Sequence, residues 1–157
     1  SQAILAGDIV LPHLNGSIVS LKREKRFGQS QFDILIETDT GQQAFVEVKG
    51  MTLENQQIGA FPDAPTLRGL KHVTELIDAA AQGYQSYLLF VVQFAAVKTA
   101  TIHTQMQPQL AEMITLGQQQ GLSVLAYNCQ VTPATIEIEH QVPFDVTTMF
   151  EDPNLER

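Results

Sequence analysis

Two acids and a lysine lie close together in one short stretch of this sequence. Asp33 is followed by Glu47 and Lys49, and the last two are separated by a single valine in "FVEVKG". Carboxylate oxygens brought together are the ligands that Mg²⁺ takes in proteins. A bound metal ion activates water and stabilises charge on a phosphoryl group, and a nearby lysine orients the nucleophile or balances that charge. The order Asp, then Glu-x-Lys one strand later, therefore predicts a phosphodiesterase site with Asp33 and Glu47 as the metal ligands.

Two predicted strands, residues 32–38 and 44–49, must bring these side chains together. If their loop is centred on Thr40, residues whose numbers sum to 80 lie opposite one another, so Asp33 faces Glu47. Like charges in that position destabilise an exposed pair by roughly 0.2 to 1 kcal/mol, and Lys49 or a shared divalent cation would offset the repulsion. One face of the hairpin is then apolar, and the other is charged. The apolar face carries Phe32, Ile34, Ile36, Ala44, Val46 and Val48, and the charged face carries Asp33, Glu37, Glu47 and Lys49.

A plainer interpretation of the same pattern is a solvated outer face with scattered charges. It remains open because a register slip of one residue would move every side chain to the opposite face and separate the set.

The remaining elements follow from the hydrophobic periodicity and the turn residues. We expect a short helix at 2–6, a strand at 17–26, a helix from about 66 to 82, a strand at 85–93, a helix from Pro108 to about 120, and strands at 122–130 and 135–139. Asp63 or Thr66 would cap the first long helix, and Gly83 would end it. Its apolar face would be Leu67, Leu70, Val73, Leu76, Ile77, Ala80 and Ala81. The order β β β α β α β β predicts a single α/β domain with a mixed central sheet flanked by helices.

The cations are clustered although the formal net charge is −8. Four of them lie in "LKREKRFG", and two more lie on the helix that follows the Glu-x-Lys strand: Lys22, Arg23, Lys25, Arg26, Arg68 and Lys71. These positions are candidates for contact with a nucleic-acid backbone, and the alternative is an ordinary solvated surface. We expect His72, beside Lys71, to be a surface residue and Cys129, in an apolar strand, to be a core residue.

Composition narrows the cellular setting. The N-terminal stretch "SQAILAGDIVLP" has neither a basic region nor a continuous apolar region, so no secretory signal is expected there. The apolar run "YLLFVV" is strand-sized and too short to span a membrane. With a single cysteine no intrachain disulfide can form, and a reducing cytoplasm fits best.

Several motifs, in order over nearly all of residues 1–145, resemble the sugar fermentation stimulation protein A family. They are "RFGQSQFDILIE", "FVEVKGMTL", "FPDAPTLRGLKHVTEL", "LLFVVQ" and "VLAYNCQV". The resemblance implies a cytoplasmic DNA-binding protein that helps regulate sugar (maltose) utilisation. It also implies a PD-(D/E)XK (restriction-endonuclease-like) core at 1–146, a loosely held tail at 147–157, and an N-terminal OB-like domain that is absent from this chain.

The family's nuclease-type positions correspond to Asp33, Glu47 and Lys49, with Glu24 on the preceding strand as a fourth candidate. This sequence departs from the family pattern in having Gln31 where Arg is expected, Gly50 where Asn or Ser is usual and Pro65 where Val is usual. The first departure removes a phosphate contact.

Two functions therefore stay open. One is a Mg²⁺-dependent nuclease acting on DNA, and the other is a non-catalytic DNA-binding regulator whose acidic site is vestigial. A protein-interaction module without nucleic acid would leave the cation cluster unexplained. A homodimer is an open option for the assembly, and no membrane partner is expected.

Overall fold

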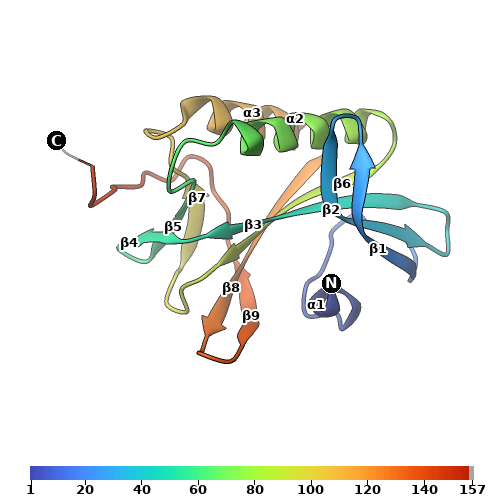
Figure 1. Ribbon diagram of the computed structural model, residues 1–157, viewed down its shortest axis with the longest axis horizontal. Helices are drawn as coiled ribbons and strands as arrows, with labels where there is room; N and C mark the ends of the chain where they lie inside the picture. Colours follow the sequence, from blue (N-terminus) through green and yellow to red (C-terminus); the bar gives the residue numbers. More distant parts are fainter. Residues whose placement is uncertain (156–157) are drawn as a thin grey trace.

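The computed structural model describes residues 1–155, which fold around a six-stranded sheet of order β1-β2-β3-β6-β8-β9 (Figure 1). The strands of this sheet are β1 (Ile18–Phe27), β2 (Ser30–Thr38), β3 (Gln43–Met51), β6 (Gln85–Val92), β8 (Leu122–Val131) and β9 (Ile136–Val142). The first three strands are antiparallel, β3, β6 and β8 run parallel, and β9 returns antiparallel. The mixed α/β sheet expected from the sequence is confirmed.

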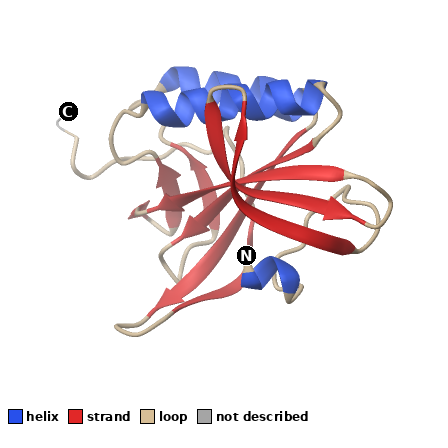
Figure 2. Ribbon diagram, turned by 45° about the vertical axis from the view of Figure 1, so that its right-hand side comes forward, coloured by secondary structure: helices blue, strands red, loops and turns tan. Residues whose placement is uncertain are grey.

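Two long helices, α2 (Leu67–Ala81) and α3 (Pro108–Gln119), lie together on one face of this sheet (Figure 2). The short helix α1 (Gln2–Leu5) and the segment after it cover the other face, where Ile4, Ile9 and Leu11 pack in a cluster with Ile34 and Ile36. The central strand β6 is buried on both sides, as its continuous apolar run predicts.

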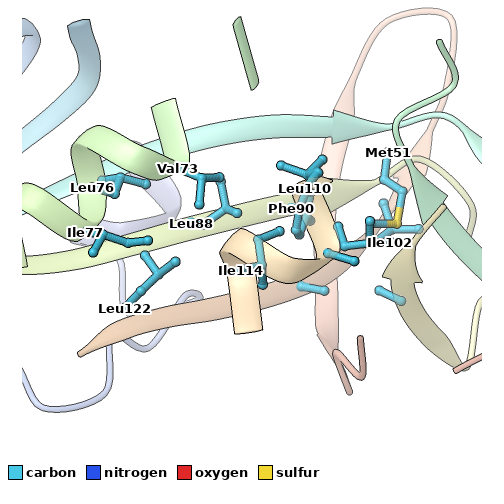
Figure 3. Packing of buried hydrophobic residues seen from close by; sticks show 14 of the residues in the cluster. Met51, Val73, Leu76, Ile77, Leu88, Phe90, Ile102, Leu110, Ile114 and Leu122 are labelled. Atoms are coloured by element: carbon cyan, nitrogen blue, oxygen red, sulfur yellow. The ribbon is translucent and has the colours of Figure 1, made fainter. Parts of the chain in front are cut away.

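The main core lies between the helices and the sheet (Figure 3). It includes Val73, Leu76 and Ile77 of α2, Leu110 and Ile114 of α3, and Leu88, Phe90 and Leu122 of the sheet.

Helix α2 begins where the sequence predicts. The side chain of Thr66, not that of Asp63, caps it by accepting a hydrogen bond from the Gly69 N–H at 2.9 Å. Gly83, with φ of +98°, ends it. The predicted apolar face is wrong at both ends, because Leu67 is 82% exposed and Ala81 is exposed. The buried stripe instead runs through Gly69, His72, Val73 and Leu76, so His72 is a buried residue.

Three short strands form a second sheet that the sequence does not predict. They are β4 (Leu53–Asn55), β5 (Ile58–Phe61) and β7 (Thr99–Ile102), and they lie in two regions where the sequence predicts loops. The β4–β5 turn uses Gln56 and Gln57 at φ of +53° and +65°, where glycine or asparagine is the usual signal. Because β5 pairs with β7 in parallel over a long sequence separation, no local pattern reveals this sheet.

The C-terminal tail differs from the expectation that residues 147–157 are loosely held. Phe150 and Asp152 are buried, and Phe150 packs edge-on against the His103 ring, with centroids 5.2 Å apart. The Nδ1 atom of His103 accepts a hydrogen bond from the Met106 N–H, so Nε2 carries the hydrogen that is donated to Asp152 Oδ2 at 2.9 Å. Phe150 and Asp152 therefore anchor the described part of the tail, up to residue 155, on His103, the residue that follows β7. Within the same described residues, no helix is long and apolar enough to cross a bilayer.

Candidate functional site

The β2–β3 hairpin has the predicted register. Leu35 lies opposite Phe45 and Glu37 opposite Gln43, but the backbone pairing ends at Ile34 and Val46. Beyond that point side chains replace backbone partners: the Asp33 N–H donates to Glu47 Oε1 at 3.2 Å, and the Val48 N–H donates to Asp33 Oδ2 at 2.7 Å. Two reciprocal hydrogen bonds therefore hold the two carboxylates side by side where the strands separate.

The face of the hairpin that carries the acids is not a solvated outer surface. Phe45 and Leu35 pack in the cluster beneath α2, and Glu47 is only 2% exposed. Phe32 also packs in this cluster, with its ring 5.1 Å from that of Phe45, so its predicted place beside Ile34 is wrong. The separation of the strands after Ile34 explains this change of side.

Lys49 and His72 complete the cluster around Glu47. The Nζ atom of Lys49 lies 3.4 Å from Glu47 Oε2 and 2.8 Å from His72 Nδ1. Because an ammonium group can only donate, Nδ1 of His72 accepts this hydrogen bond and Nε2 carries the ring hydrogen. The Oε2 atom of Glu47 also lies against His72 Nδ1.

The electrostatics of the cluster follow from burial. Burial and the neighbouring Asp33 carboxylate raise the pKa of Glu47 to about 7, although Lys49 opposes the change. Burial and the positive charges of Lys49 and Arg68 lower the pKa of His72 to about 4. Between these values the Glu47 carboxyl carries a proton and the His72 ring is neutral. A cation that replaced this proton would favour the ionised carboxylate.

The carboxylate pair could hold a divalent cation. Asp33 is exposed while Glu47 is buried behind it, so the pair has one side open to solvent. No group of three or more His, Cys, Asp or Glu side chains suited to a metal ion occurs among residues 1–155. Two carboxylates are a sufficient protein contribution for Mg²⁺, which keeps several water ligands of its own.

Glu24, the fourth sequence candidate, is not brought into this cluster. Arg23 pairs with Ile34 and Lys25 with Phe32, which places Glu24 level with Asp33 on the neighbouring strand. Glu24 has a left-handed backbone with φ of +58°, and its carbonyl accepts a hydrogen bond from the Gln31 side chain. Its side chain is exposed.

The predicted nucleic-acid contacts are exposed but not gathered on one face. Lys22 and Arg23 are successive residues of β1, so their side chains point to opposite faces of the sheet. Arg23 lies toward α1, where its Nε donates to Ser1 Oγ at 3.2 Å. Lys25 and Arg26 follow the irregularity at Glu24 and are exposed as well.

On α2, Arg68 is exposed, whereas Lys71 is engaged within the chain. Its Nζ donates to the Gln29 carbonyl at 2.7 Å, and Glu75, one turn later, accepts from the Gln29 N–H at 3.2 Å. These two side chains hold the tip of the β1–β2 hairpin against the helix.

Sequence reasoning missed His72 as a member of the site. Its spacing from Gly69, Val73 and Leu76 is the i, i+3, i+4, i+7 pattern of a buried helix face, and this signal could have indicated that its ring points toward the sheet.

Together, the mixed sheet and the carboxylate pair at its strand opening define an α/β domain with a candidate divalent-cation site. The chain belongs to the sugar fermentation stimulation protein family: the family profile described as "Sugar fermentation stimulation protein RE domain" matches residues 2–135. The resemblance inferred from the sequence motifs is thereby confirmed.

Individual relatives agree with this assignment. A sugar fermentation stimulation protein homolog of Enterococcus mundtii is 59% identical over 154 residues, which are 98% of this chain and 64% of that protein. A homolog from Clostridium botulinum is 40% identical over 127 residues, covering 81% of this chain and 55% of its own length. The chain thus spans less than two thirds of the length of these curated relatives.

A solved structure, described as Pyrococcus furiosus SfsA in complex with Ca²⁺, has a similar fold. Its TM-score is 0.79 at 28% identity, and the alignment covers 91% of this chain and 61% of that chain.

Proposed function

We propose that this chain is a divalent-metal-dependent phosphodiester hydrolase domain that acts on DNA. The observation that carries the proposal is the pairing of Asp33 and Glu47 at the opening of the β2–β3 ladder, with the Lys49 ammonium 3.4 Å from Glu47. Its relatives are named sugar fermentation stimulation proteins, which supports a role for the whole protein in sugar utilisation.

The metal ligands in this proposal are the carboxylates of Asp33 and Glu47, and the ion is Mg²⁺. The donor set fits, because both groups offer hard oxygen atoms and one side of the pair is open to water. The Pyrococcus protein, which has the same fold, was solved with Ca²⁺, another oxygen-seeking divalent cation. When bound, such an ion supplies an activated water and charge stabilisation for the phosphoryl group.

The chain's own residues then have distinct tasks. The Val48 N–H fixes the Asp33 carboxylate, and the Asp33 N–H fixes Glu47, so neither carboxylate has to be ordered when the ion arrives. The side chain of Lys49 is 18% exposed. Its ammonium group donates to a phosphoryl oxygen or to the attacking water.

DNA contact in this proposal depends on local and not on net charge. Lys22, Arg23, Lys25 and Arg26 are exposed along edge strand β1, and Arg68 is exposed on α2 near the site. They offset the repulsion that a chain of net charge −8 exerts on phosphate.

The test is a cleavage assay on the purified chain. Plasmid and linear DNA are incubated with Mg²⁺ or Mn²⁺, with EDTA as the metal-free arm and with Lys49→Ala and Asp33→Asn as inactive controls. Lys98→Ala, which removes an exposed lysine on the segment before β7, is the matched control that keeps activity. Cleavage that survives in Lys49→Ala would indicate a contaminating nuclease. Salt-dependent DNA binding without cleavage would leave the alternative, a regulator with a vestigial acidic site.

A further inference from the structure

The side chain that holds Lys49 in place comes from a different element. Lys49 extends from β3, and its Nζ lies 2.8 Å from Nδ1 of His72 on α2. The His72 side chain is only 6% exposed, and its ring packs edge-on against Phe32 with centroids 6.4 Å apart. The ring therefore has little freedom to move away from Lys49.

The ammonium group of Lys49 has three hydrogens to donate. One is donated to His72 Nδ1 at 2.8 Å, and Glu47 Oε2 lies 3.4 Å from Nζ as an ion-pair partner, so groups on two different elements restrict where the ammonium points. A lysine side chain has several rotatable bonds and otherwise samples many positions. With only Glu47 as its partner, the ammonium could swing around the carboxylate.

We propose that His72 is a positioning residue: by accepting a hydrogen bond at Nδ1, it fixes the Lys49 ammonium beside Glu47 so that the remaining N–H points to the reacting phosphoryl group. This inference rests on the proposed hydrolase function for its catalytic consequence, whereas the placement of the ammonium is a property of the folded chain alone. Misplacing a catalytic group by about 1 Å can cost on the order of a hundredfold in rate.

Two substitutions at position 72 separate the hydrogen bond from the packing. His72→Asn keeps an acceptor oxygen near the place of Nδ1, whereas His72→Leu keeps bulk and apolar contact but no acceptor. Val73→Ala is the matched control, because Val73 is the adjacent buried residue of α2, packs into the main core and offers Lys49 no side-chain acceptor. All proteins are measured well below their unfolding temperatures.

The first readout is the steady-state rate of metal-dependent DNA cleavage. We expect kcat of His72→Leu to fall by about tenfold or more with KM changed by less than about threefold, and His72→Asn to recover most of the loss. Val73→Ala should keep kcat. Equal losses in His72→Leu and Val73→Ala, or no recovery in His72→Asn, would overturn the positioning role.

The second readout does not need activity. In a protein labelled with ¹⁵N-lysine, the Lys49 ammonium gives a ¹H–¹⁵N cross-peak when hydrogen bonds slow its proton exchange, and Lys49→Arg assigns that peak. The peak should be present in the wild type, His72→Asn and Val73→Ala and absent in His72→Leu. If the wild type does not cleave DNA but this pattern holds, the proposed function fails and the placement of Lys49 stands. A peak that persists in His72→Leu refutes the inference whether or not DNA is cleaved.

Discussion

Replacing Glu47 by glutamine should stabilise the protein at alkaline pH and not at acidic pH. Burial raises the pKa of this carboxyl from the ordinary value of 4.5 to about 7, so the folded state keeps the proton that the unfolded state has already lost. The contribution of Glu47 to stability is therefore highest below about pH 4.5, falls as pH rises, and stops falling above about pH 7. The difference between the two pKa values corresponds to a loss of at most about 3 kcal/mol in the unfolding free energy. Water that enters beside the exposed Asp33 reduces this loss to roughly 1 to 3 kcal/mol.

The measurement is chemical unfolding of wild type and Glu47→Gln at pH 5 and pH 8.5, with EDTA present. Glutamine has nearly the same shape as glutamate and keeps an oxygen for the Asp33 N–H. Its amide group next to Lys49 changes the unfolding free energy by an amount that does not depend on pH. Only the change in the stability difference between the two pH values is informative. We expect Glu47→Gln to gain about 1 to 3 kcal/mol relative to wild type on going from pH 5 to pH 8.5. The control is Glu112→Gln, at an exposed position on α3, whose difference from wild type should stay constant.

The reasoning would be refuted if the difference in unfolding free energy between Glu47→Gln and wild type did not change with pH, or changed in the opposite direction. Either result would mean that the attraction of Lys49 outweighs burial and the neighbouring Asp33, so that Glu47 is already ionised in the folded protein at pH 5. The carboxylate pair would then be stable without a cation.

Three further perturbations test separate parts of the structure. Millimolar Mg²⁺ should raise the melting temperature of the wild type and have little effect on Asp33→Asn, because only a folded state that binds the ion is stabilised by mass action; equal shifts would exclude this carboxylate as a ligand. Charge reversal at both Arg23 and Lys25 should weaken DNA binding and make its log-log salt slope shallower by about 0.9 for each phosphate that is no longer neutralised, whereas an unchanged slope would remove this strand from the interface. Phe150→Ala should lower the unfolding free energy by about 2 to 4 kcal/mol in urea titrations, since the side chain is buried against His103, and a cost near zero would restore the expectation of a loose tail.

The parts of the fold that the sequence predicts are those determined by local patterns. The β2–β3 register follows from a short polar loop and alternating side chains, and a slip of one residue would have placed Ile34 and Ile36 on the wrong face. Helix α2 follows from its Thr66 cap and the glycine at its end. The acids and the lysine come together because they lie on these two well-determined strands.

The predictions that are wrong concern contacts between distant segments. The β4–β5–β7 sheet joins strands of three or four residues, which are too short to show a period. The burial of Phe150 and Asp152 depends on His103, forty-nine residues before Asp152. Phe32 changes sides because β2 and β3 separate at Asp33, and alternation along one strand does not indicate where a neighbouring strand diverges.

Helix α2 connects the two sides of the candidate site. Its His72 holds Lys49 of β3, and its Lys71 and Glu75 hold Gln29 at the tip of the β1–β2 hairpin. The helix itself is fixed by its apolar stripe, which packs on the sheet independently of any ligand. The position of the Lys49 ammonium and the position of the β1–β2 hairpin therefore both depend on how α2 packs on the sheet. A change that shifts α2 along the sheet alters both together, whereas the Asp33 and Glu47 pair is held within the hairpin by its own backbone and is expected to keep its arrangement.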